Sequence, residues 1–563
     1  MVLPRHPAVP PEVAERTGAD DAAFPTLTAD HLDRLRAFGE VVEVEPGGLL
    51  FVEGQSRYDF FVILAGAVAV VSRNIDRSVE VPIARHTPGR FIGELSLLTG
   101  ERTTLAARAD ADGTVVLRIS PDRFRELMSS EPDIADIVFT AFVARREVLR
   151  TGAGAASIRI IGSRFSARAV ELESFARRQR LAHQWIDLDD PAVDDIEVLL
   201  ASVGVMPRDT PVVITPTAVL RRPTVGQLSA HLGLAFRSSP GQVHDLIVIG
   251  AGPAGLAAGV YGASEGLDTL VVDGHSVGGQ AGASSRIENY FGFPNGLSGS
   301  DLVESGALQA QRLGATINTP CRVNAIRVEA DHFVLTLGAD DEVAARAVIV
   351  ATGVRYRKLG VADLERYENA GVFYAATDIE ARVCGGRHVV IVGGGNSAGQ
   401  AAVFLAQRGS SVSIVLRRDN LAETMSKYLI DRIVANPDIT VLPHTQITAL
   451  HGDASLTGVD LTESPPGGSA STRTIDTAGV FSFIGAVADT QWLGDLVALD
   501  TDGFVLTDHD LPGGSGGGLA FETSQPGVFA VGDVRHGSMK RVAAAVGEGS
   551  SAVRSVHQRL APT

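Results

Sequence analysis

The chain has 563 residues, of which 45% are hydrophobic and 20% charged, a composition typical of a protein with several folded domains. Its formal net charge of −17 argues against nucleic acid or an anionic membrane as a partner, since both require clustered positive charge. Because the sequence has only two cysteines, Cys321 and Cys384, we expect no disulfide framework and a reducing, cytoplasmic setting. We also expect neither a signal peptide nor a membrane span, since the first residues are polar and the most apolar stretch, 246–263, is interrupted by Gly and Pro.

Residues 1–150 are predicted to form a β-roll with flanking helices. Short apolar runs between residues 41 and 119 are separated by Gly turns, which is the pattern of closely spaced strands. A short helix is predicted at 29–38, and residues 120–150 are expected to be helical. A Gly/Ala-rich stretch, 151–156, is expected to link this part to the next.

Residues 93–104, read as GELSLLTGERTT, resemble the phosphate-binding cassette of cyclic-nucleotide-binding domains. The resemblance implies an effector, cyclic AMP or cyclic GMP, whose phosphate pairs with Arg102 and whose ribose 2′-hydroxyl donates to Glu94. A helix at 140–148 would cover the base. The residues expected at this site are Gly93, Glu94, Leu95, Arg102 and Thr103. The alternative is a degenerate domain that serves only for docking.

Residues 156–236 are predicted to form a compact α/β unit. Strands are expected at 158–161, 183–187 and 211–215, with helices at 167–180, 194–203 and 225–231. The order resembles a thioredoxin- or glutaredoxin-like domain, with Thr210-Pro211 where that family carries a cis-proline. Ser163 and Ser166 stand where its cysteines are expected, and a hydroxyl cannot carry out thiol–disulfide exchange. We therefore expect a spacer or docking module.

Two Gly-rich fingerprints follow, GAGPAG at 250–255 and GGGNSA at 393–398, each directly after an apolar strand. Their glycines allow the backbone to turn tightly and approach a pyrophosphate at a helix N-terminus. Two such turns in one chain predict a flavin enzyme that also binds a nicotinamide nucleotide. Asp273 ends the next strand, 269–272, and is expected to bind a ribose hydroxyl.

From residue 243 to 563 the chain resembles the thioredoxin-reductase-like flavoproteins. The matching stretches are GAGPAG, GGQ, IENYFGFP, ATG, GGGNSA, LRRD, FSFIG and VGDV. The resemblance implies two Rossmann-like α/β domains and a homodimer. An FAD domain in two pieces, 243–358 and 485–563, would enclose an NADPH domain at 359–484.

The resemblance also implies the cofactor sites. The expected FAD-binding residues are Gly250, Gly252, Pro253, Ala254, Gly255, Asp273, Gly279, Gln280, Asn289, Thr352, Gly353, Gly532, Asp533, Arg541, Val542 and Ala543. The expected NADPH-binding residues are Gly393, Gly395, Asn396, Ser397, Ala398, Arg417 and Arg418. The two adjacent arginines follow the strand 413–416 and favour NADPH over NADH, although Leu416 and Ala422 replace a histidine and an arginine that are usual in the family.

The decisive departure from the family follows Tyr374, where a redox Cys-x-x-Cys is usual and this chain has Ala375 and Asp378. The two single cysteines stand in apolar surroundings and are expected to be inert, so no catalytic side chain and no metal ligand are assigned. We expect an NADPH-dependent flavoprotein oxidoreductase, regulated by a cyclic nucleotide, whose electron acceptor the sequence does not identify. The alternatives are a thioredoxin-disulfide reductase that uses other thiols, and a redox sensor that does not turn over.

Overall fold

The computed structural model describes residues 22–55, 57–73, 80–93, 97, 102–103, 105–151, 158–164, 166–179, 181–189, 200, 204–215, 217–234, 241–284, 286–338, 341–368, 370–453, 455–511 and 518–561. The chain forms two compact units, Met1–Ala235 and Phe236–Thr563.

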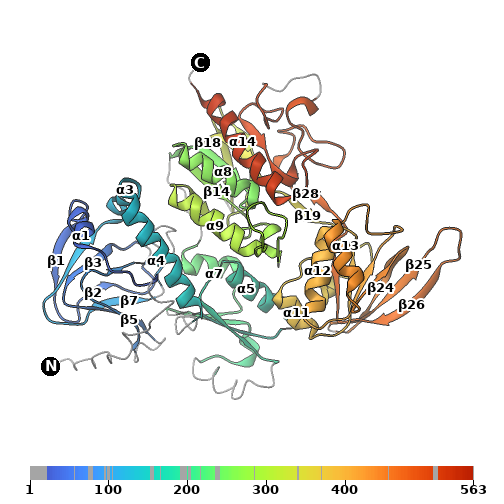
Figure 1. The fold of residues 1–563 in the computed structure, drawn as a ribbon, viewed down its shortest axis with the longest axis horizontal. Helices are drawn as coiled ribbons and strands as arrows, with labels where there is room; N and C mark the ends of the chain where they lie inside the picture. Colours follow the sequence, from blue (N-terminus) through green and yellow to red (C-terminus); the bar gives the residue numbers. More distant parts are fainter. Residues whose placement is uncertain are drawn as a thin grey trace. The chain divides into compact units, whose positions relative to one another are not determined.

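The first unit begins with the expected β-roll. In its described residues the strands form two antiparallel sheets, of order β1-β8-β3-β6 and β2-β7-β4-β5 (Figure 1). Phe60, Phe91, Phe124 and Phe142 pack ring against ring between the roll and its helices. The strands are β1 (Glu40–Val44), β2 (Leu49–Phe51), β3 (Phe60–Ala65), β4 (Val68–Arg73), β5 (Glu80–His86), β6 (Phe91–Ile92), β7 (Ala106–Ala109) and β8 (Thr114–Ile119).

Helices flank this roll, but the predicted boundaries were partly wrong. Helix α1 (Ala29–Leu35) ends three residues before the predicted Phe38. The helical stretch after the roll is divided into α3 (Pro121–Ser130) and α4 (Pro132–Thr151). The division falls at Pro132 because a proline has no N–H with which to continue α3, whereas it is well suited to begin a new helix.

The α/β part of this unit has a mixed sheet of order β10-β9-β11-β12. Strands β9 and β10 are parallel, β11 runs antiparallel to β9, and the Thr210–Pro211 peptide before β11 is cis. The elements are β9 (Ile158–Gly162), α5 (Ala167–Arg178), β10 (His183–Asp187), β11 (Val212–Ile214), β12 (Val219–Arg221) and α7 (Val225–Leu232). Strands β9, β10 and β11 lie where the sequence predicted strands, whereas β12 was not predicted. All but one residue of the helix predicted at 194–203 lie outside the described residues.

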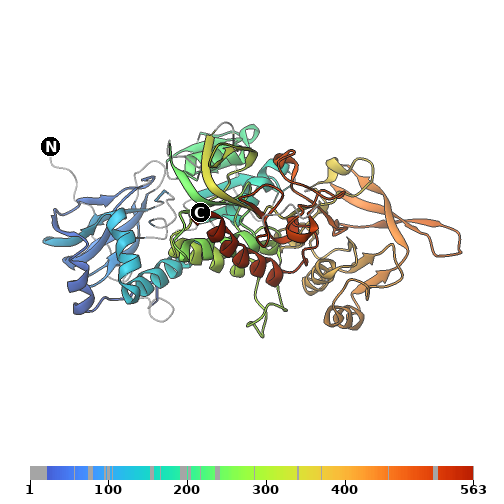
Figure 2. The ribbon, with the colours of Figure 1, turned by 90° about the horizontal axis from the view of Figure 1, so that it is seen from above.

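The second unit contains a first lobe built from two distant parts of the sequence. Its sheet has the order β15-β14-β13-β18-β17-β16, and β29 pairs in parallel with β18. Helix α14 lies along α8, as Figures 1 and 2 both show. The elements are β13 (Val243–Ile249), α8 (Pro253–Ser264), β14 (Thr269–Val272), α9 (Gly299–Arg312), β15 (Thr316–Asn318), β16 (Val323–Val328), β17 (Phe333–Leu337), β18 (Asp341–Val350), β29 (Val528–Ala530) and α14 (Val542–Leu560).

The residues between these two parts form a second lobe, with a parallel sheet of order β20-β27-β21-β22-β23 and an antiparallel meander β24-β25-β26. A short antiparallel ribbon, β19 (Val354–Tyr356) with β28 (Ala486–Ala488), joins the two lobes where the chain leaves and re-enters the first. The elements are α10 (Leu364–Tyr367), β20 (Val372–Phe373), α11 (Asp378–Cys384), β21 (Val389–Val392), α12 (Asn396–Gln407), β22 (Val412–Val415), α13 (Lys427–Ala435), β23 (Ile439–Leu442), β24 (Thr445–Gly452), β25 (Leu456–Glu463), β26 (Ser471–Asp476) and β27 (Gly479–Ser482).

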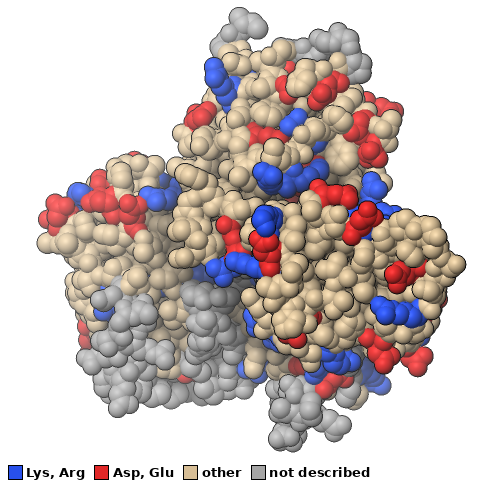
Figure 3. Space-filling model, turned by 45° about the vertical axis from the view of Figure 1, so that its right-hand side comes forward, with Lys and Arg blue, Asp and Glu red and all other residues tan. Residues whose placement is uncertain are grey.

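The surface mixes charges of both signs. On the face drawn in Figure 3, acidic and basic side chains are interspersed. None of the helices in the described part of the chain combines the length and the apolar character that a membrane crossing demands.

Candidate cofactor and effector sites

Gly252 and Gly395 each precede a helix whose first N–H groups have no side-chain cap. They are the N-cap residues of α8 and α12, with φ of −74° and −92°, angles that any residue can adopt. A Cβ at Gly252 would come no closer than 4.0 Å to another atom, and one at Gly395 would meet nothing within 4 Å. Packing does not require glycine at either position, so the open space is available to a ligand group, and a helix N-terminus favours a phosphate.

Other glycines of the fingerprints are required by the fold itself. A Cβ at Gly250, which has a φ of +111°, would lie 2.2 Å from the carbonyl oxygen of Ala351. A Cβ at Gly255 would lie 1.8 Å from the Gly250 carbonyl oxygen. Gly393 has a φ of +136°, and a Cβ added to it would lie 2.4 Å from the carbonyl oxygen of Phe483. The glycines therefore divide into those that the fold requires, for a positive φ or a close backbone contact, and those that leave room for a ligand.

Asp273 lies at the end of β14, as predicted, and its carboxylate braces the first fingerprint. One oxygen accepts from the backbone N–H of Ala251 at 2.9 Å, and the other from His275 at 2.8 Å and Ser276 at 3.3 Å. These bonds hold the Gly-rich turn against the strand end.

The next segments of the expected flavin site are tied to one another. Gln280 donates to the Val354 carbonyl at 2.5 Å, and the Thr352 hydroxyl donates to the Asp489 carbonyl at 3.0 Å. Gly353 has a φ of +65° and would meet nothing within 4 Å with an added Cβ. The open space at Gly252 thus recurs at Gly353, at the end of the neighbouring strand β18. Gly279, Asn289 and the helix position Pro253 lie on the same lobe, and Asn289 is exposed.

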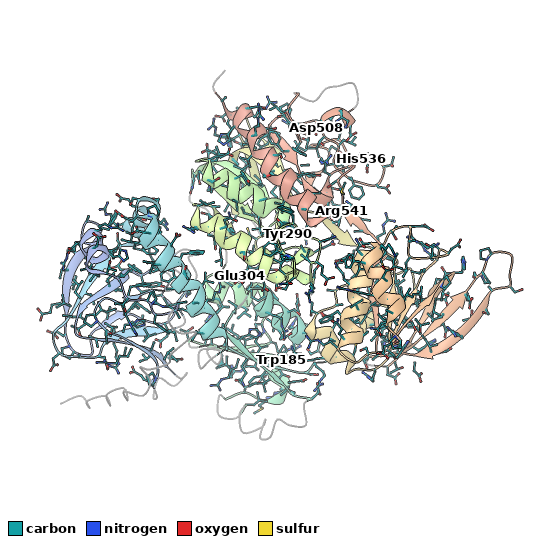
Figure 4. All side chains as sticks on the ribbon, in the orientation of Figure 1. Trp185, Tyr290, Glu304, Asp508, His536 and Arg541 are labelled. Atoms are coloured by element: carbon teal, nitrogen blue, oxygen red, sulfur yellow. The ribbon has the colours of Figure 1, made fainter. Side chains whose placement is uncertain are left out.

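The C-terminal part of the lobe brings Asp533 and the start of α14 together. Burial raises the pKa of Asp533, while Lys540 opposes that shift and its ammonium donates to the Asp533 carbonyl at 2.6 Å. Arg541 lies at the start of α14 (Figure 4). It is the N-cap but provides no side-chain cap, so the N–H groups of Val542 and Ala543 begin the helix uncapped. Two residues here were not among the predicted site residues: Lys540, just before α14, and Glu548, which accepts from the Gly532 N–H at 2.7 Å. The available signal for Glu548 was that it is the single acidic residue of α14.

The position that follows Tyr374 holds no thiol. The Tyr374 hydroxyl donates to Glu368 at 2.7 Å, and its ring is parallel to that of Tyr356, with ring centroids 6.3 Å apart. Ala375 is half-buried, and Asp378 begins α11, although its side chain lies outside the description.

Both cysteines are buried and form no disulfide. Burial raises the pKa of each thiol to about 12, the Cys321 pKa with help from Asp341 and the Cys384 pKa against the opposing charge of Arg387. At neutral pH such thiols are protonated and are poor nucleophiles.

Arg417 and Arg418 follow β22 beside the second fingerprint. Arg417 is exposed, whereas Arg418 forms an ion pair with Glu423 at 3.3 Å and its Nε lies 3.9 Å from where a Cβ on Gly394 would be. The Asn396 side chain accepts from the Ser426 N–H at 2.7 Å, so it ties α12 to α13. Ser397 is exposed and Ala398 is buried.

In the β-roll, Gly93 lies under α4. A Cβ on Gly93 would approach Phe142 to 3.0 Å, and the buried Arg145 donates to the carbonyls of Gly93 at 3.0 Å and Phe91 at 3.1 Å. The helix predicted to cover the base is therefore fixed to the start of the cassette. Arg145 was not among the predicted site residues, because in the sequence it stands beside Arg146 and Glu147 as one of several charges of the helix.

Of the other cassette residues, Glu94 and Leu95 lie outside the described residues. Arg102 is exposed, and Thr103 is buried. The Thr103 hydroxyl donates to the Val52 carbonyl at 2.6 Å and its N–H to the Gln55 carbonyl at 3.0 Å. Thr103 thus uses both donors within the protein and positions Arg102.

Comparison with known proteins agrees with a nucleotide-cofactor region in the second unit and a β-roll in the first. A family model described as pyridine nucleotide-disulphide oxidoreductase matches residues 244–549, and one described as a cyclic nucleotide-binding domain matches 41–131. Thioredoxin reductase of Mycolicibacterium smegmatis is 35% identical over 57% of this chain and 97% of its own length, and that of Streptomyces clavuligerus is 33% identical over 57% and 94%. Among solved structures, T. acidophilum thioredoxin reductase is 30% identical, covers 56% of this chain and 98% of its own, and superposes with a TM-score of 0.51. The Lactococcus lactis enzyme in its FR conformation is 28% identical over the same shares, also with a TM-score of 0.51.

Proposed function

Because this chain belongs to the pyridine nucleotide-disulphide oxidoreductase family, we propose that it is an NADPH-dependent flavoprotein whose electrons leave by a route other than a protein dithiol. Thioredoxin reductases of this family use FAD and NADPH. We propose 243–358 and 485–563 as the FAD domain and 359–484 as the NADPH domain, in a homodimeric, cytoplasmic protein.

One observation carries the proposal: the residues after Tyr374 are Ala375 and Asp378, and the two thiols of the chain are buried and protonated. Neither Ala375 nor Asp378 forms a mixed disulfide. A thioredoxin-disulfide reductase that relies on Cys321 or Cys384 would require a thiolate that burial disfavours. The acceptor is therefore one that takes electrons from reduced flavin directly, such as a quinone, dioxygen, a small disulfide or an electron-transfer protein.

The two cofactor sites fit the residues present. When bound, NADPH supplies a hydride and FAD accepts it, which is chemistry that needs no acid or base from the protein. The open spaces at Gly252 and Gly353 would receive FAD, and that at Gly395 would receive NADPH. Arg417 and Arg418 would bind the 2′-phosphate. The uncapped start of α14 would direct N–H groups at the flavin, and Asp533 would hold a ribityl hydroxyl.

The α/β part of the first unit, which we assign to 156–236, is proposed to be a thioredoxin-like domain without redox activity. Its sheet order β10-β9-β11-β12, with β9 and β10 parallel, supports that assignment. Ser163 donates to Asp189 at 2.5 Å, and Ser166 caps α5 by accepting from the Ala169 N–H. The two serines therefore have structural roles, in keeping with a docking module.

The β-roll and its helices, which we assign to 1–150, are proposed to bind cyclic AMP or cyclic GMP and to regulate flavin reduction. Arg102 is exposed for a phosphate, Thr103 positions it, and Arg145 connects the cassette to α4. Gly93, Glu94 and Leu95 would complete the site.

The test is anaerobic stopped-flow reduction of the bound flavin by NADPH, with and without each cyclic nucleotide, followed by turnover with a panel of acceptors. We expect rapid reduction, turnover with at least one direct acceptor, and no reduction of a cognate thioredoxin. If NADPH does not reduce the flavin, the proposed oxidoreductase activity is wrong and the alternative of a redox sensor without turnover remains. If the protein reduces thioredoxin at the rate usual for the family, the proposal that its electrons leave without a protein dithiol is wrong.

A further inference from the structure

Arg102, the arginine of the cyclic-nucleotide cassette, also contacts the α/β part of the same unit. Its side chain lies against Gly233, the residue that ends α7 in the α/β part. A Cβ at Gly233 would be 2.7 Å from the Arg102 Nε, 2.8 Å from its Cγ and 3.0 Å from its Cδ. The glycine therefore leaves the space that Arg102 fills.

The end of α7 is a favourable place for a guanidinium. The last carbonyls of a helix carry a partial negative charge that attracts a cation. Gly233 has the left-handed conformation, with a φ of +76°, that closes a helix. His231, two residues earlier, is hydrogen-bonded by Thr215 at 2.9 Å and Thr217 at 3.1 Å. Burial and then the charge of Arg102 lower the His231 pKa, so this histidine is neutral and does not repel Arg102 at neutral pH.

Two further contacts join the β-roll to the α/β part. Arg146 of α4 donates to the carbonyl of Gln179, the C-cap of α5, at 3.3 Å. A Cβ on Gly54, in the β-roll, would lie 3.4 Å from the Thr217 side chain. The two arginines thus lie at the C-terminal ends of two different helices, and one of them belongs to the nucleotide cassette.

We propose that Arg102 serves two partners in turn, the C-terminal end of α7 in the absence of nucleotide and the cyclic phosphate in its presence. This inference rests on the proposed binding of a cyclic nucleotide to the β-roll. Binding the phosphate bidentately draws the guanidinium away from Gly233 and loosens the α/β part from the β-roll. The contact between Arg102 and α7 must be given up when the nucleotide binds, so this contact weakens nucleotide binding. By the same factor, bound nucleotide weakens the contact between Arg102 and α7.

The test compares two glycine substitutions in the full-length protein. Gly233→Asn introduces a residue that tolerates left-handed backbone, but its Cβ would occupy the space that the Arg102 side chain fills. Gly204→Asn is the matched control, because Gly204 has a similar φ of +68° and would meet nothing within 4 Å. Calorimetry with cyclic AMP and cyclic GMP should show at least about 5-fold tighter binding to Gly233→Asn than to wild type, and no change for Gly204→Asn.

A second measurement needs no variant. Hydrogen exchange of residues 225–234 in the wild-type protein should become faster when the nucleotide is added, because the end of α7 loses its cover. This measurement decides the matter if Gly233→Asn fails to fold. Equal affinity in all three proteins together with unchanged exchange would overturn the sharing of Arg102 while nucleotide binding stands. Absence of binding of either nucleotide to wild type and to Gly233→Asn would instead remove the proposed effector function itself.

Discussion

Cys384 packs directly beneath Gly479: a Cβ added to the glycine would lie 2.8 Å from the sulfur. The thiol is fully buried in the core of the second lobe, among residues of α12 and β21. There is no room at this thiol for a disulfide partner, and its pKa of about 12 keeps it protonated at neutral pH.

Removing both thiols should therefore leave the enzyme active. We expect Cys321→Ala with Cys384→Ala to keep wild-type rates of NADPH oxidation with a direct acceptor, and to lose some thermal stability because core atoms are deleted. The measurement is steady-state turnover beside an insulin-coupled thioredoxin assay. If wild type reduces thioredoxin and the double variant does not, one of these cysteines takes part in catalysis.

Flavin retention should depend on the open space at Gly252. In Gly252→Val the side chain would enter the space that we assign to the pyrophosphate, so the purified protein should lose its bound FAD. The control is Gly360→Ala, at an exposed glycine of the same unit where a Cβ also meets nothing within 4 Å. The ratio of flavin absorbance to protein absorbance checks both. Full flavin content in Gly252→Val would show that the first fingerprint is not the flavin site.

Cofactor preference should depend on Arg417 and Arg418. Replacing each by Gln should weaken NADPH binding by about 1.5–3 kcal/mol per charge-assisted contact and leave NADH binding unchanged. Arg473→Gln, at an exposed arginine of β26 in the same lobe, serves as the control. Glu423→Gln should not weaken NADPH, because it releases Arg418 from its ion pair. Equal losses for NADPH and NADH would contradict the role in binding the 2′-phosphate.

The β-roll should lose stability in mild acid because of His86. Burial, followed by the charges of Arg145 and Arg90, holds the His86 pKa well below its ordinary 6.5. The unfolded chain protonates His86 near pH 6.5, whereas the folded chain protonates it only at lower pH. The contribution of neutral His86 to the free energy of unfolding is therefore complete above pH 6.5 and is lost progressively below it. Thermal unfolding between pH 7.5 and 5.5 should show a smaller decrease for His86→Leu than for wild type. His509→Gln, at a histidine whose side chain is 88% exposed, should behave as wild type.

Much of the architecture could be predicted from local pattern. The β-roll, the positions of β9, β10 and β11 in the α/β part and the two Rossmann-like lobes follow from Gly turns, apolar runs and fingerprint spacing. Element ends were less predictable: α1 is shorter than predicted and the helix after the roll is interrupted, because the predicted stretch included Pro132.

The candidate site was only partly predictable, for a physical reason. Glycine spacing indicated both fingerprints but did not distinguish Gly252, which leaves room for a ligand, from Gly255, which allows a close backbone contact. The contacts of Arg145 with Gly93 and of Arg102 with Gly233 join residues 52 and 131 positions apart in the chain. No local pattern reports such pairs, because they arise only when separate elements pack.

The contact between α8 and α14 has a consequence for synthesis of the protein. A Cβ on Gly549 would lie 2.0 Å from the carbonyl oxygen of Ala254, so the two helices touch backbone to backbone, and β29 completes the sheet beside β18. A ribosome releases the start of this lobe long before it releases β29 and α14, while the intervening lobe emerges in full. During translation the second lobe is therefore free to fold first, and the first lobe is completed only when its last strand and helix leave the exit tunnel.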